Sequence, residues 1–410
     1  MDGFVDTVVI GAGQAGLATS RCLTDRGIDH VVLERGCIGQ RWLGERWDSF
    51  RLLSPNWLTR LPGFAYAGPD PHGFQTGAQV ADLLEEYARE SGASVHTGVA
   101  VRAVEPGPGR WTVRTDRGGL CAGNVVVATG DLDRPAVPAL DAALPAGTTR
   151  LHTSAYRNPA QLPAGGVLVV GAGPSGQQIA NELACAGRTV HLAVGRHRAL
   201  PRRYRGRDTY WWMHRTGSLH RTRASLPGGP RRGPNAVLAG GLDDLDLHRL
   251  VHNGVVPHGR LTGVVDGVAH FAADLPETLR AADAHAERFR ASVDAFVTRT
   301  GLDVPPAPAW RPPAAPWAHR ASTRLDLERI ATVVWATGFR RDFSWLPAAV
   351  LDADGEPVHD RGVTAAPGLY VVGLRWLHRR SSSFLAGVGA DAEHLADHIA
   401  VRERLLTAAA

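Results

Sequence analysis

The chain has 410 residues, 44% of them hydrophobic and 21% charged, so it is long and apolar enough to bury the cores of two soluble domains. All 45 basic residues are arginine, which excludes mechanisms that require a lysine, such as a Walker-type phosphate loop or a Schiff base. The formal net charge is +5, but the arginines are scattered apart from one local cluster, and without a nucleic-acid-binding motif we expect no nucleic-acid partner.

A glycine-rich turn, GAGQAG at residues 11–16, separates the first predicted strand from the first predicted helix. The apolar run before it is typical of a buried strand, and residues 17–26 form an amphipathic stretch that ends at a glycine. In such a turn Gly11 permits the sharp bend, Gly13 lets the backbone approach a pyrophosphate, and Gly16 lets the helix pack against the strand. The pattern predicts that a dinucleotide binds at the positive N-terminus of this helix.

The next predicted strand, residues 28–33, ends beside a carboxylate that bears on the kind of dinucleotide. Glu34 stands where an acid can accept hydrogen bonds from both hydroxyls of a ribose. We therefore expect the first unit to bind a dinucleotide with an unphosphorylated ribose, as in FAD, with Glu34 and the adjacent Arg35 among the cofactor-binding residues.

The same arrangement recurs 160 residues later (171 minus 11), where GAGPSG occupies residues 171–176. An apolar run again precedes the turn, and a predicted helix that ends at a glycine again follows it. Gly171, Gly173 and Gly176 take the roles of the three earlier glycines. Ser175 lies at the start of the helix and is a further cofactor-binding candidate. One such turn is a weak signal, but two in the same context predict two dinucleotide sites in one chain.

The two units differ at the ribose position. Shifting Glu34 by 160 residues gives Val194, and the stretch that follows, GRHRALPRRYRGR at 195–207, holds arginines in place of an acid. A 2′-phosphate repels an acid and is gripped by guanidinium groups, so the second unit is predicted to bind NADPH. Arg196 is the first phosphate-binding candidate, with Arg198 and Arg203 next. The alternative is that this stretch is a solvated basic loop.

Two apolar runs mark the expected joints between the units. VVVATG at 125–130 and VVWATG at 333–338 are typical of buried strands that end in tight turns, so we expect the chain to leave the first domain near Gly130 and to return near Val333. The predicted fold is α/β with two Rossmann-like dinucleotide-binding domains, the NADPH domain inserted into the FAD domain. The expected boundaries are 1–145 for the first part of the FAD domain, 146–325 for the NADPH domain with a helical and aromatic insertion, and 326–410 for the second part of the FAD domain.

The C-terminal segment and the ends of these strands supply the remaining cofactor-binding candidates. Residues 368–372 predict a strand that closes on Gly373, and a helix is expected after Phe384 with Ser383 as its N-cap. The candidates are Gly373, Ser383, Phe384, Thr129, Gly130, Thr337 and Gly338.

The order of these motifs resembles that of the class B flavoprotein monooxygenases, which include flavin-containing monooxygenases, Baeyer–Villiger monooxygenases and microbial N-hydroxylases. The resemblance covers essentially the whole chain and is carried by GAGQAG, VVLERG, GQRWLGERWDSF, VVVATG, GAGPSG, VVWATGF and GLYVVG. It implies that NADPH reduces FAD, that O2 adds to the flavin to give a C4a-(hydro)peroxide, and that one oxygen atom passes to a small organic substrate. It also implies that NADP⁺ stays bound and shields that species from water.

The resemblance implies two catalytic candidates between the domains. The family fingerprint F-x-G-x-x-x-H-x-x-x-(W/Y/F) is matched in part by LPAGTTRLHTSAY, with His152 and Tyr156 at the family spacing. The phenylalanine is missing and the glycine is displaced by one position. A structural role at the domain joint is the alternative for His152. Tyr156 favours oxidation at nitrogen or sulfur, because the Baeyer–Villiger branch usually has tryptophan there.

Asn56, in LLSPNWLTRLPG, matches a family asparagine that hydrogen-bonds near the reactive edge of the flavin and is the third catalytic candidate. A turn asparagine after a proline is the alternative. The resemblance also implies that Trp42 and Trp47 line the flavin ring, although packing in the core would explain both. The aromatic stretch DTYWWMHRTG at 208–217 could cap the nicotinamide, but we favour a structural role for its tryptophans.

Other functions remain open beside the leading one. Oxygen insertion next to a ketone would be favoured by an arginine in the site. An NADPH-dependent flavoprotein reductase without oxygenation shares the expected fold, but the cysteines are widely spaced and form no C-x-x-C pair for a thiol relay. A non-enzymatic redox sensor has no feature in its favour. The cysteine spacing also predicts neither a disulfide framework nor a metal site.

No apolar run reaches the roughly 18 residues of a membrane-spanning helix, so no span is expected. The first residues, MDGFVDTVVIGAG, lead straight into a strand and turn instead of a signal peptide, and a cytoplasmic location is expected. The expected partners are a small organic substrate and O2, while a homo-oligomer stays open.

Overall fold

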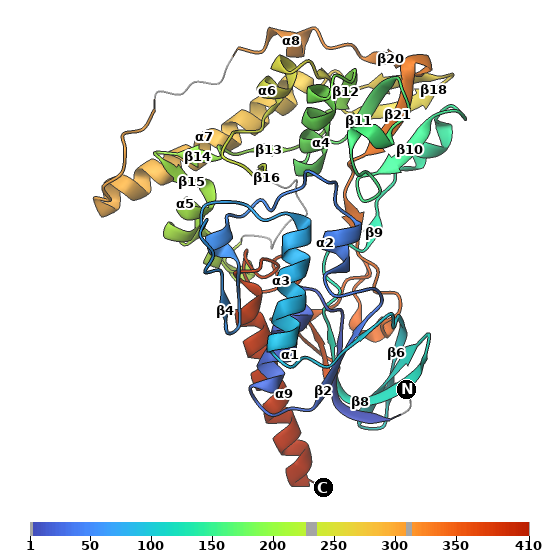
Figure 1. The fold of residues 1–410 in the computed structure, drawn as a ribbon, viewed down its shortest axis with the longest axis vertical. Coiled ribbons are helices and arrows are strands. Elements are labelled where there is room, and N and C mark those ends of the chain that lie inside the picture. Colours follow the sequence, from blue (N-terminus) through green and yellow to red (C-terminus); the bar gives the residue numbers. More distant parts are fainter. Residues whose placement is uncertain (1–2, 227–235, 309–313, 410) are drawn as a thin grey trace.

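Two β-sheets, one with a parallel centre and one parallel throughout, each with helices packed against it, form the architecture of the protein in the computed structural model (Figure 1). The structure describes residues 3–226, 236–308 and 314–409. The first sheet takes strands from both ends of the chain and the second takes strands from between them, so one unit is inserted into the other. The predicted α/β fold of two Rossmann-like domains is confirmed.

The first sheet is centred on β1 (Phe4–Ile10). Its parallel neighbours are β2 (His30–Glu34) and β5 (Val95–Thr97) on one side, and β8 (Gly118–Val127) and β25 (Leu369–Val371) on the other. Most of β1 and β8 is buried, as expected where both faces of a parallel sheet are covered. Because β25 comes from the C-terminal segment, this sheet is complete only after the chain has returned from the second unit.

Antiparallel strands also join the first sheet, at the beginning of β8 and beyond β25. The meander of β6 (Val101–Gly107) and β7 (Arg110–Thr115) joins it through β8, and the hairpin of β23 (His359–Asp360) and β24 (Val363–Thr364) joins it through β25.

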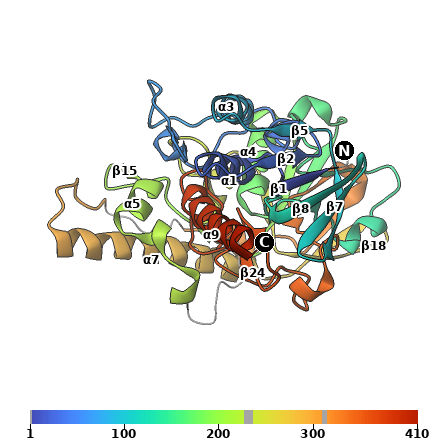
Figure 2. The same cartoon turned by 90° about the horizontal axis from the view of Figure 1, so that it is seen from below.

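Helices α1 (Gln14–Thr24), α3 (Gly77–Glu90) and α9 (Val388–Ala409) pack on this sheet, and α1 and α9 lie side by side (Figure 2). A capping box at Thr76 starts α3, since its side chain accepts from the amide of Gln79. The short helix α2 (Gln40–Gly44) follows β2.

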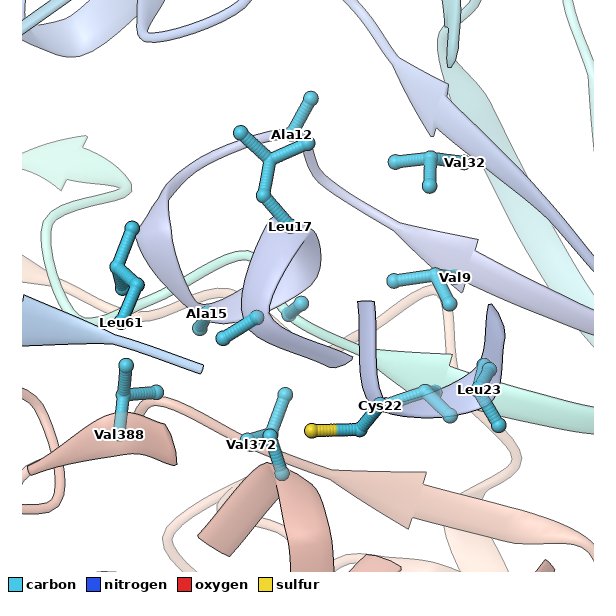
Figure 3. Close-up of a cluster of buried hydrophobic side chains, with 14 of the residues drawn as sticks. Val9, Ala12, Ala15, Leu17, Cys22, Leu23, Val32, Leu61, Val372 and Val388 are labelled. Carbon is cyan, nitrogen blue, oxygen red and sulfur yellow. The ribbon is translucent and has the colours of Figure 1, made fainter. Parts of the chain in front are cut away.

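The core between these helices and the sheet is apolar (Figure 3). Val9 and Val32 from the strands meet Leu17 of α1 and Val388 of α9, and all four are fully buried. Burying each such side chain contributes roughly 1.5–3 kcal/mol relative to leaving it exposed. The periodic apolar positions of α1 therefore fix the glycine-rich turn, where the helix begins, against the end of β1.

The second sheet is parallel throughout. Its order is β10 (Thr149–His152), β21 (Ile330–Trp335), β11 (Gly166–Val170), β12 (Val190–Ala193) and β17 (Val256–His258). The helices of this part of the chain are α4 (Pro174–Cys185), α5 (Thr209–Arg215), α6 (Leu247–His252), α7 (Leu275–Thr300) and α8 (Pro316–His319).

The position of β21 differs from the expected domain boundary at 325/326. Val333 pairs with Arg150 of β10 and Leu168 of β11, so the strand that was expected to re-enter the first domain belongs to the second sheet. The reason is that VVVATG and VVWATG mark the same place in each unit: β8 lies beside β1, and β21 lies beside β11. The chain returns only after Trp335.

The two crossings between the units run together. The outgoing strand β9 (Arg134–Pro135) pairs antiparallel with the returning strand β22 (Phe339–Arg340). Figure 1 shows the helices and sheet of the second unit above those of the first, with this linker between them.

The remaining short strands form separate two- or three-stranded sheets. They are β3 (Arg60–Leu61) with β4 (Phe64–Ala65), β13 (Arg198–Ala199) with β16 (Ala236–Val237), β14 (Arg203–Tyr204) with β15 (Arg207–Asp208), and β18 (Leu261–Val265), β19 (Val268–Phe271) and β20 (Arg324–Asp326) in one sheet.

The last helix begins later than expected. Ser383 is not its N-cap, because the chain makes another turn first, in which the amide of Val388 donates to the carbonyl of Phe384. Within the described ranges, no helix combines the length and the apolar character needed to cross a membrane.

Candidate functional site

A cleft of about 430 Å³ opens at the carboxyl ends of β1, β2 and β8, the edge of a parallel sheet where ligands bind. Its wall comes from the turn after β1, the end of β2, helix α2, the turn after β8 and the segment after β25. The sequence-predicted residues that line it are Gly11, Gly13, Glu34, Arg35, Trp42, Thr129, Gly130, Gly373 and Ser383. Candidates from widely separated parts of the chain are thus brought together.

The glycines of the first turn face two different neighbours. Gly11 has φ +107°, and a Cβ on Gly16 would lie 1.8 Å from the carbonyl oxygen of Gly11, so both glycines are required by the chain itself. A Cβ on Gly13 would meet no atom within 4 Å. Gly13 therefore borders open space at the N-terminus of α1, where backbone amides and the helix dipole favour an anion.

Glu34 is held at the rim of the cleft by the backbone. One carboxylate oxygen accepts from the amide of Ala12 at 2.8 Å, and the other accepts from the amide of Gly36 at 2.9 Å. A carboxylate has about four acceptor positions, so each oxygen can take one further donor from a ligand. Gly373, on the other side of α1, has φ +76°, and its Cβ would come within 2.5 Å of that of Ala15.

Charged residues that the sequence analysis did not single out also line the cleft. Arg41 contacts Asp133 at 2.9 Å and Glu45 at 3.0 Å, and Arg35 contacts Asp133 at 3.1 Å. This network ties helix α2 to the segment after β8. The stretch GQRWLGERWDSF was considered for its tryptophans, and nothing in its spacing indicated that Arg41 would face the cleft.

Arg375 is the second arginine that the sequence did not indicate. It lines the cleft, and its amide donates to the Oδ2 of Asp131 at 2.8 Å. Burial raises the pKa of Asp131, and the nearby Arg341 and Arg375 act in the opposite direction. For Arg375 burial acts in the other direction and lowers the pKa, whereas the charge of Asp131 raises it.

The two tryptophans lie in different places. Trp42 lines the cleft, and the guanidinium of Arg46 stacks 5.4 Å from the centre of its ring. Burial lowers the pKa of Arg46 to about 10, although Glu45 raises it. Trp47 instead is buried in the apolar core of the second unit, so packing accounts for it and it does not line the cleft.

The second glycine-rich turn repeats the geometry of the first. Gly171 has φ +113°, a Cβ on Gly176 would lie 1.8 Å from the carbonyl oxygen of Gly171, and a Cβ on Gly173 would meet nothing within 4 Å. Ser175 lies in the first turn of α4, directly beside this opening.

The expected ribose position of the second unit carries no acid. Val194 is fully buried, and Arg196 and Arg198 after it are exposed. Thr337 and Gly338 lie at the linker, where the hydroxyl of Thr337 donates to the carbonyl of Ala136 at 2.6 Å.

His152 and Tyr156 both lie away from the cleft. The Nε2 of His152 donates to the carbonyl of Gly338 at 2.8 Å, and burial lowers the pKa of His152, so the ring is a neutral link at the domain joint. Tyr156 is fully buried in the second core, and its hydroxyl donates to Glu182 at 2.8 Å. Burial and Glu182 raise the pKa of Tyr156. Neither side chain is placed to touch a ligand in the cleft.

Asn56 lies in a short 3-10 turn and is buried. Its amide nitrogen donates to the carbonyl of Asp70 at 2.8 Å, while its buried Oδ1 has no partner among the described residues. Phe384 lies in an apolar cluster between the units, with its ring 6.1 Å from that of Tyr210.

Comparisons with known proteins agree with this arrangement. The profile of the family described as pyridine nucleotide-disulphide oxidoreductases matches residues 8–208. An uncharacterized CzcO-like oxidoreductase of Geobacillus kaustophilus is 33% identical over 404 residues, which cover 97% of this chain and 99% of that protein. The indole-3-pyruvate monooxygenase YUCCA1 of Oryza sativa is 32% identical over 208 residues, covering 50% of this chain and 51% of that protein. The chain belongs to the CzcO-like oxidoreductases, and its likeness to an indole-3-pyruvate monooxygenase agrees with the predicted class B flavoprotein monooxygenase family.

The fold of this family agrees as well. The structure of a flavin-containing monooxygenase from Stenotrophomonas maltophilia superposes with a TM-score of 0.64 at 21% identity, covering 98% of this chain and 99% of the other. The predicted family is confirmed, and the protein is an NAD(P)H-dependent flavoprotein oxidoreductase of the monooxygenase type.

Proposed function

We propose that the protein uses FAD and NADPH to transfer one oxygen atom from O2 to a small organic substrate, at a nitrogen or sulfur atom, in the cytoplasm. The observation that carries this proposal is the pair of glycine-rich turns, which share one geometry but differ at the ribose position. Glu34 follows the first turn, and Val194 followed by Arg196 takes its place in the second.

The residues of the cleft fit FAD. The opening beside Gly13 offers the amides of α1 to a pyrophosphate, and Glu34 has acceptor positions left for ribose hydroxyls. Trp42 and Arg46 supply a flat surface along the wall, against which a ring system can lie. Bound there, the flavin would supply the redox and oxygen chemistry, and the chain's own task would be to position it and to exclude water.

The second turn fits NADPH for a related reason. Gly173 leaves the N-terminus of α4 open to a pyrophosphate. Arg196 is exposed and forms no hydrogen bond or ion pair with the described part of the chain, so its guanidinium is available for a 2′-phosphate.

Asn56 is the residue we propose to contact the reacting end. Its Oδ1 is buried without a partner in the described ranges, which is costly unless a ligand or water donates to it. Tyr156 and His152 are not proposed as catalytic groups, because both are satisfied by other parts of the chain.

The test mixes the NADPH-reduced, FAD-loaded protein with O2 and follows the flavin spectrum and the hydrogen peroxide released. A monooxygenase is expected to regain the oxidised spectrum only after a delay, and to place an atom from isotopically labelled O2 in an amine or thioether. Immediate reoxidation with one peroxide per NADPH, in the presence of NADP⁺ and of a broad substrate panel, would contradict the proposal.

Oxygen insertion beside a carbonyl is the second candidate, because Arg375 lines the cleft. A nearby guanidinium favours a deprotonated, nucleophilic oxygen donor, which attacks carbonyls, over a protonated one. A panel that pairs each thioether with the ketone of the same shape separates the two. Sulfoxide as the only product supports the first function, and ester as the only product supports the second.

A further inference from the structure

Three arginines from three separate segments meet where the two units touch. Arg198 lies on β13 of the second unit, Arg221 follows helix α5, and Arg380 lies in the loop between β25 and α9 of the first unit. The amide of Arg380 donates to the carbonyl of Arg221 at 3.0 Å. Arg198 interacts electrostatically with Arg380, so a third positive charge acts on the same group.

A ladder of backbone hydrogen bonds fixes these segments against each other. The amide of Arg223 donates to the carbonyl of His378 at 2.7 Å, and that of Ser381 donates to the carbonyl of Leu219 at 3.2 Å. An isolated antiparallel bridge joins Thr222 to Arg379 between them. Main-chain hydrogen bonds therefore hold Arg221 and Arg380 next to each other, although their like charges repel.

No carboxylate among the described residues forms an ion pair with Arg198, Arg221 or Arg380. Arg380 is half-buried, with its guanidinium 5.3 Å from the centre of the Trp376 ring. Burial lowers its pKa, and the charges of Arg221 and Arg198 lower it further. Arg198 and Arg221 are exposed, but Arg380 is partly removed from water without a counter-ion, which is costly, so an anion bound there would stabilise it.

A histidine beside the arginines reports the same excess of positive charge. His285 of α7 has its pKa lowered to about 4 by burial and by Arg198, Arg288 and Arg380. The ring of His285 is therefore neutral at neutral pH and adds no positive charge for binding an anion.

The surroundings of the three arginines are apolar. Leu200, Leu219 and Phe384, close in sequence to the three arginines, belong to the cluster that joins the units, together with Tyr210 and Met213. Ser383, next to Phe384, lines the cofactor cleft. The segment that carries Arg380 therefore continues into both the cleft wall, at Ser383, and the apolar cluster, at Phe384.

We propose that Arg198, Arg221 and Arg380 form an anion site that takes the carboxylate of an organic-acid substrate, whose apolar body lies against the Tyr210–Phe384 cluster. This inference rests on the proposed monooxygenase function and names its substrate class. The phosphate of the nicotinamide cofactor is the other anion available; it is expected at Arg196 and Arg198 of the second unit, whereas Arg380 comes from the first. A planar carboxylate also matches the paired donors of guanidinium groups.

The test is an equilibrium titration of the FAD-loaded, full-length protein by calorimetry, with phenylacetate, its neutral isostere phenylacetamide, and 2′,5′-ADP as a fragment of NADPH. Phenylacetate should bind at least about tenfold more tightly than phenylacetamide, since hydrogen bonds to charged groups contribute roughly 1.5–3 kcal/mol. Arg380→Gln and Arg221→Ala should each weaken phenylacetate by about tenfold and leave 2′,5′-ADP within about twofold. Arg221 is exposed, so its variant is expected to fold even where the Arg380 variant fails.

Arg320→Ala is the matched control, because Arg320 is exposed at the end of α8 and lies outside the group. It should leave all three titrations unchanged. Equal binding of phenylacetate and phenylacetamide would overturn the proposal. So would a loss of 2′,5′-ADP binding in both variants with phenylacetate unaffected, which would assign the arginines to the cofactor. The titration needs neither NADPH nor O2, so failure of the oxygenation reaction would show separately.

Discussion

Two glycines in the first turn should respond to the same alanine substitution for different reasons. A Cβ on Gly16 would lie 1.8 Å from the oxygen of Gly11, so α1 would have to move by about 1.6 Å (3.4 minus 1.8) to restore ordinary contact. We expect Gly16→Ala to lower the free energy of unfolding by roughly 3 kcal/mol or more, at the upper end for overpacking. A Cβ on Gly13 meets nothing, and the backbone there has φ −85°, which any residue adopts. Gly13→Ala should therefore change stability by less than about 0.5 kcal/mol and instead obstruct the pyrophosphate.

The assay separates stability from retention of the cofactor. Urea unfolding of the FAD-free proteins by circular dichroism gives the stability, and FAD retained after ultrafiltration gives the binding. Gly176→Ala and Gly173→Ala repeat the pair in the second unit, with NADPH binding as the second readout. Equal losses of stability in Gly16→Ala and Gly13→Ala would refute the steric reasoning. Full FAD retention by Gly13→Ala would refute the assignment of the opening to a pyrophosphate.

Three further predictions concern single side chains. Arg196→Ala should raise the KM for NADPH about tenfold or more and leave that for NADH unchanged, because only the phosphorylated ribose needs the guanidinium; initial-rate kinetics with both cofactors checks this. Tyr156→Phe should cost about 1–2 kcal/mol of stability through the lost bond to Glu182, while turnover per bound flavin stays the same; a fall in turnover at full flavin content would return Tyr156 to the catalytic residues. Burial and His258 lower the pKa of His191 to about 4. Between pH 6.5 and pH 4 the unfolded chain therefore binds a proton at His191 that the folded chain does not bind, and the free energy of unfolding should fall as the pH falls through this range. Urea unfolding across the range should show a shallower fall for His191→Gln.

The elements nearest the predicted cofactor sites could be predicted because their signals are local. An apolar run, a glycine turn and an amphipathic stretch follow each other within about 20 residues, and each dictates its own backbone. Helices α1 and α4 accordingly start at their glycine turns, and Glu34 reaches the rim of the cleft. The choice of sheet for residues 330–335 is a long-range property, and an apolar strand carries no mark of its partner. The second ATG turn, at residues 336–338, was predicted to mark the return to the first sheet, but it follows β21 of the second sheet, just as the first ATG turn follows β8 of the first sheet.

Side-chain direction was the other quantity beyond the sequence. The spacing of His152 and Tyr156 matched the family fingerprint, but spacing does not show that Tyr156 points into the core towards Glu182. Conversely, Arg41 and Arg375 lie in segments with no periodic pattern, and only the fold brings them to the cleft. Of the two tryptophans in GQRWLGERWDSF, Trp42 lines the cleft and Trp47 is buried in the core of the second unit.

The two units are joined at several places, and two of these bear on how the units work together. One is the linker ladder of β9 and β22, and the other is the set of backbone bonds between residues 219–223 and 378–381. A single linker would act as a hinge, whereas a second attachment on other segments restricts rotation about it. The second attachment also carries Arg221 and Arg380, so an anion bound there would reinforce the contact between the units. Residues 209–223, which include α5, thus link the two units and also contribute Arg221 and Tyr210 to the proposed substrate site.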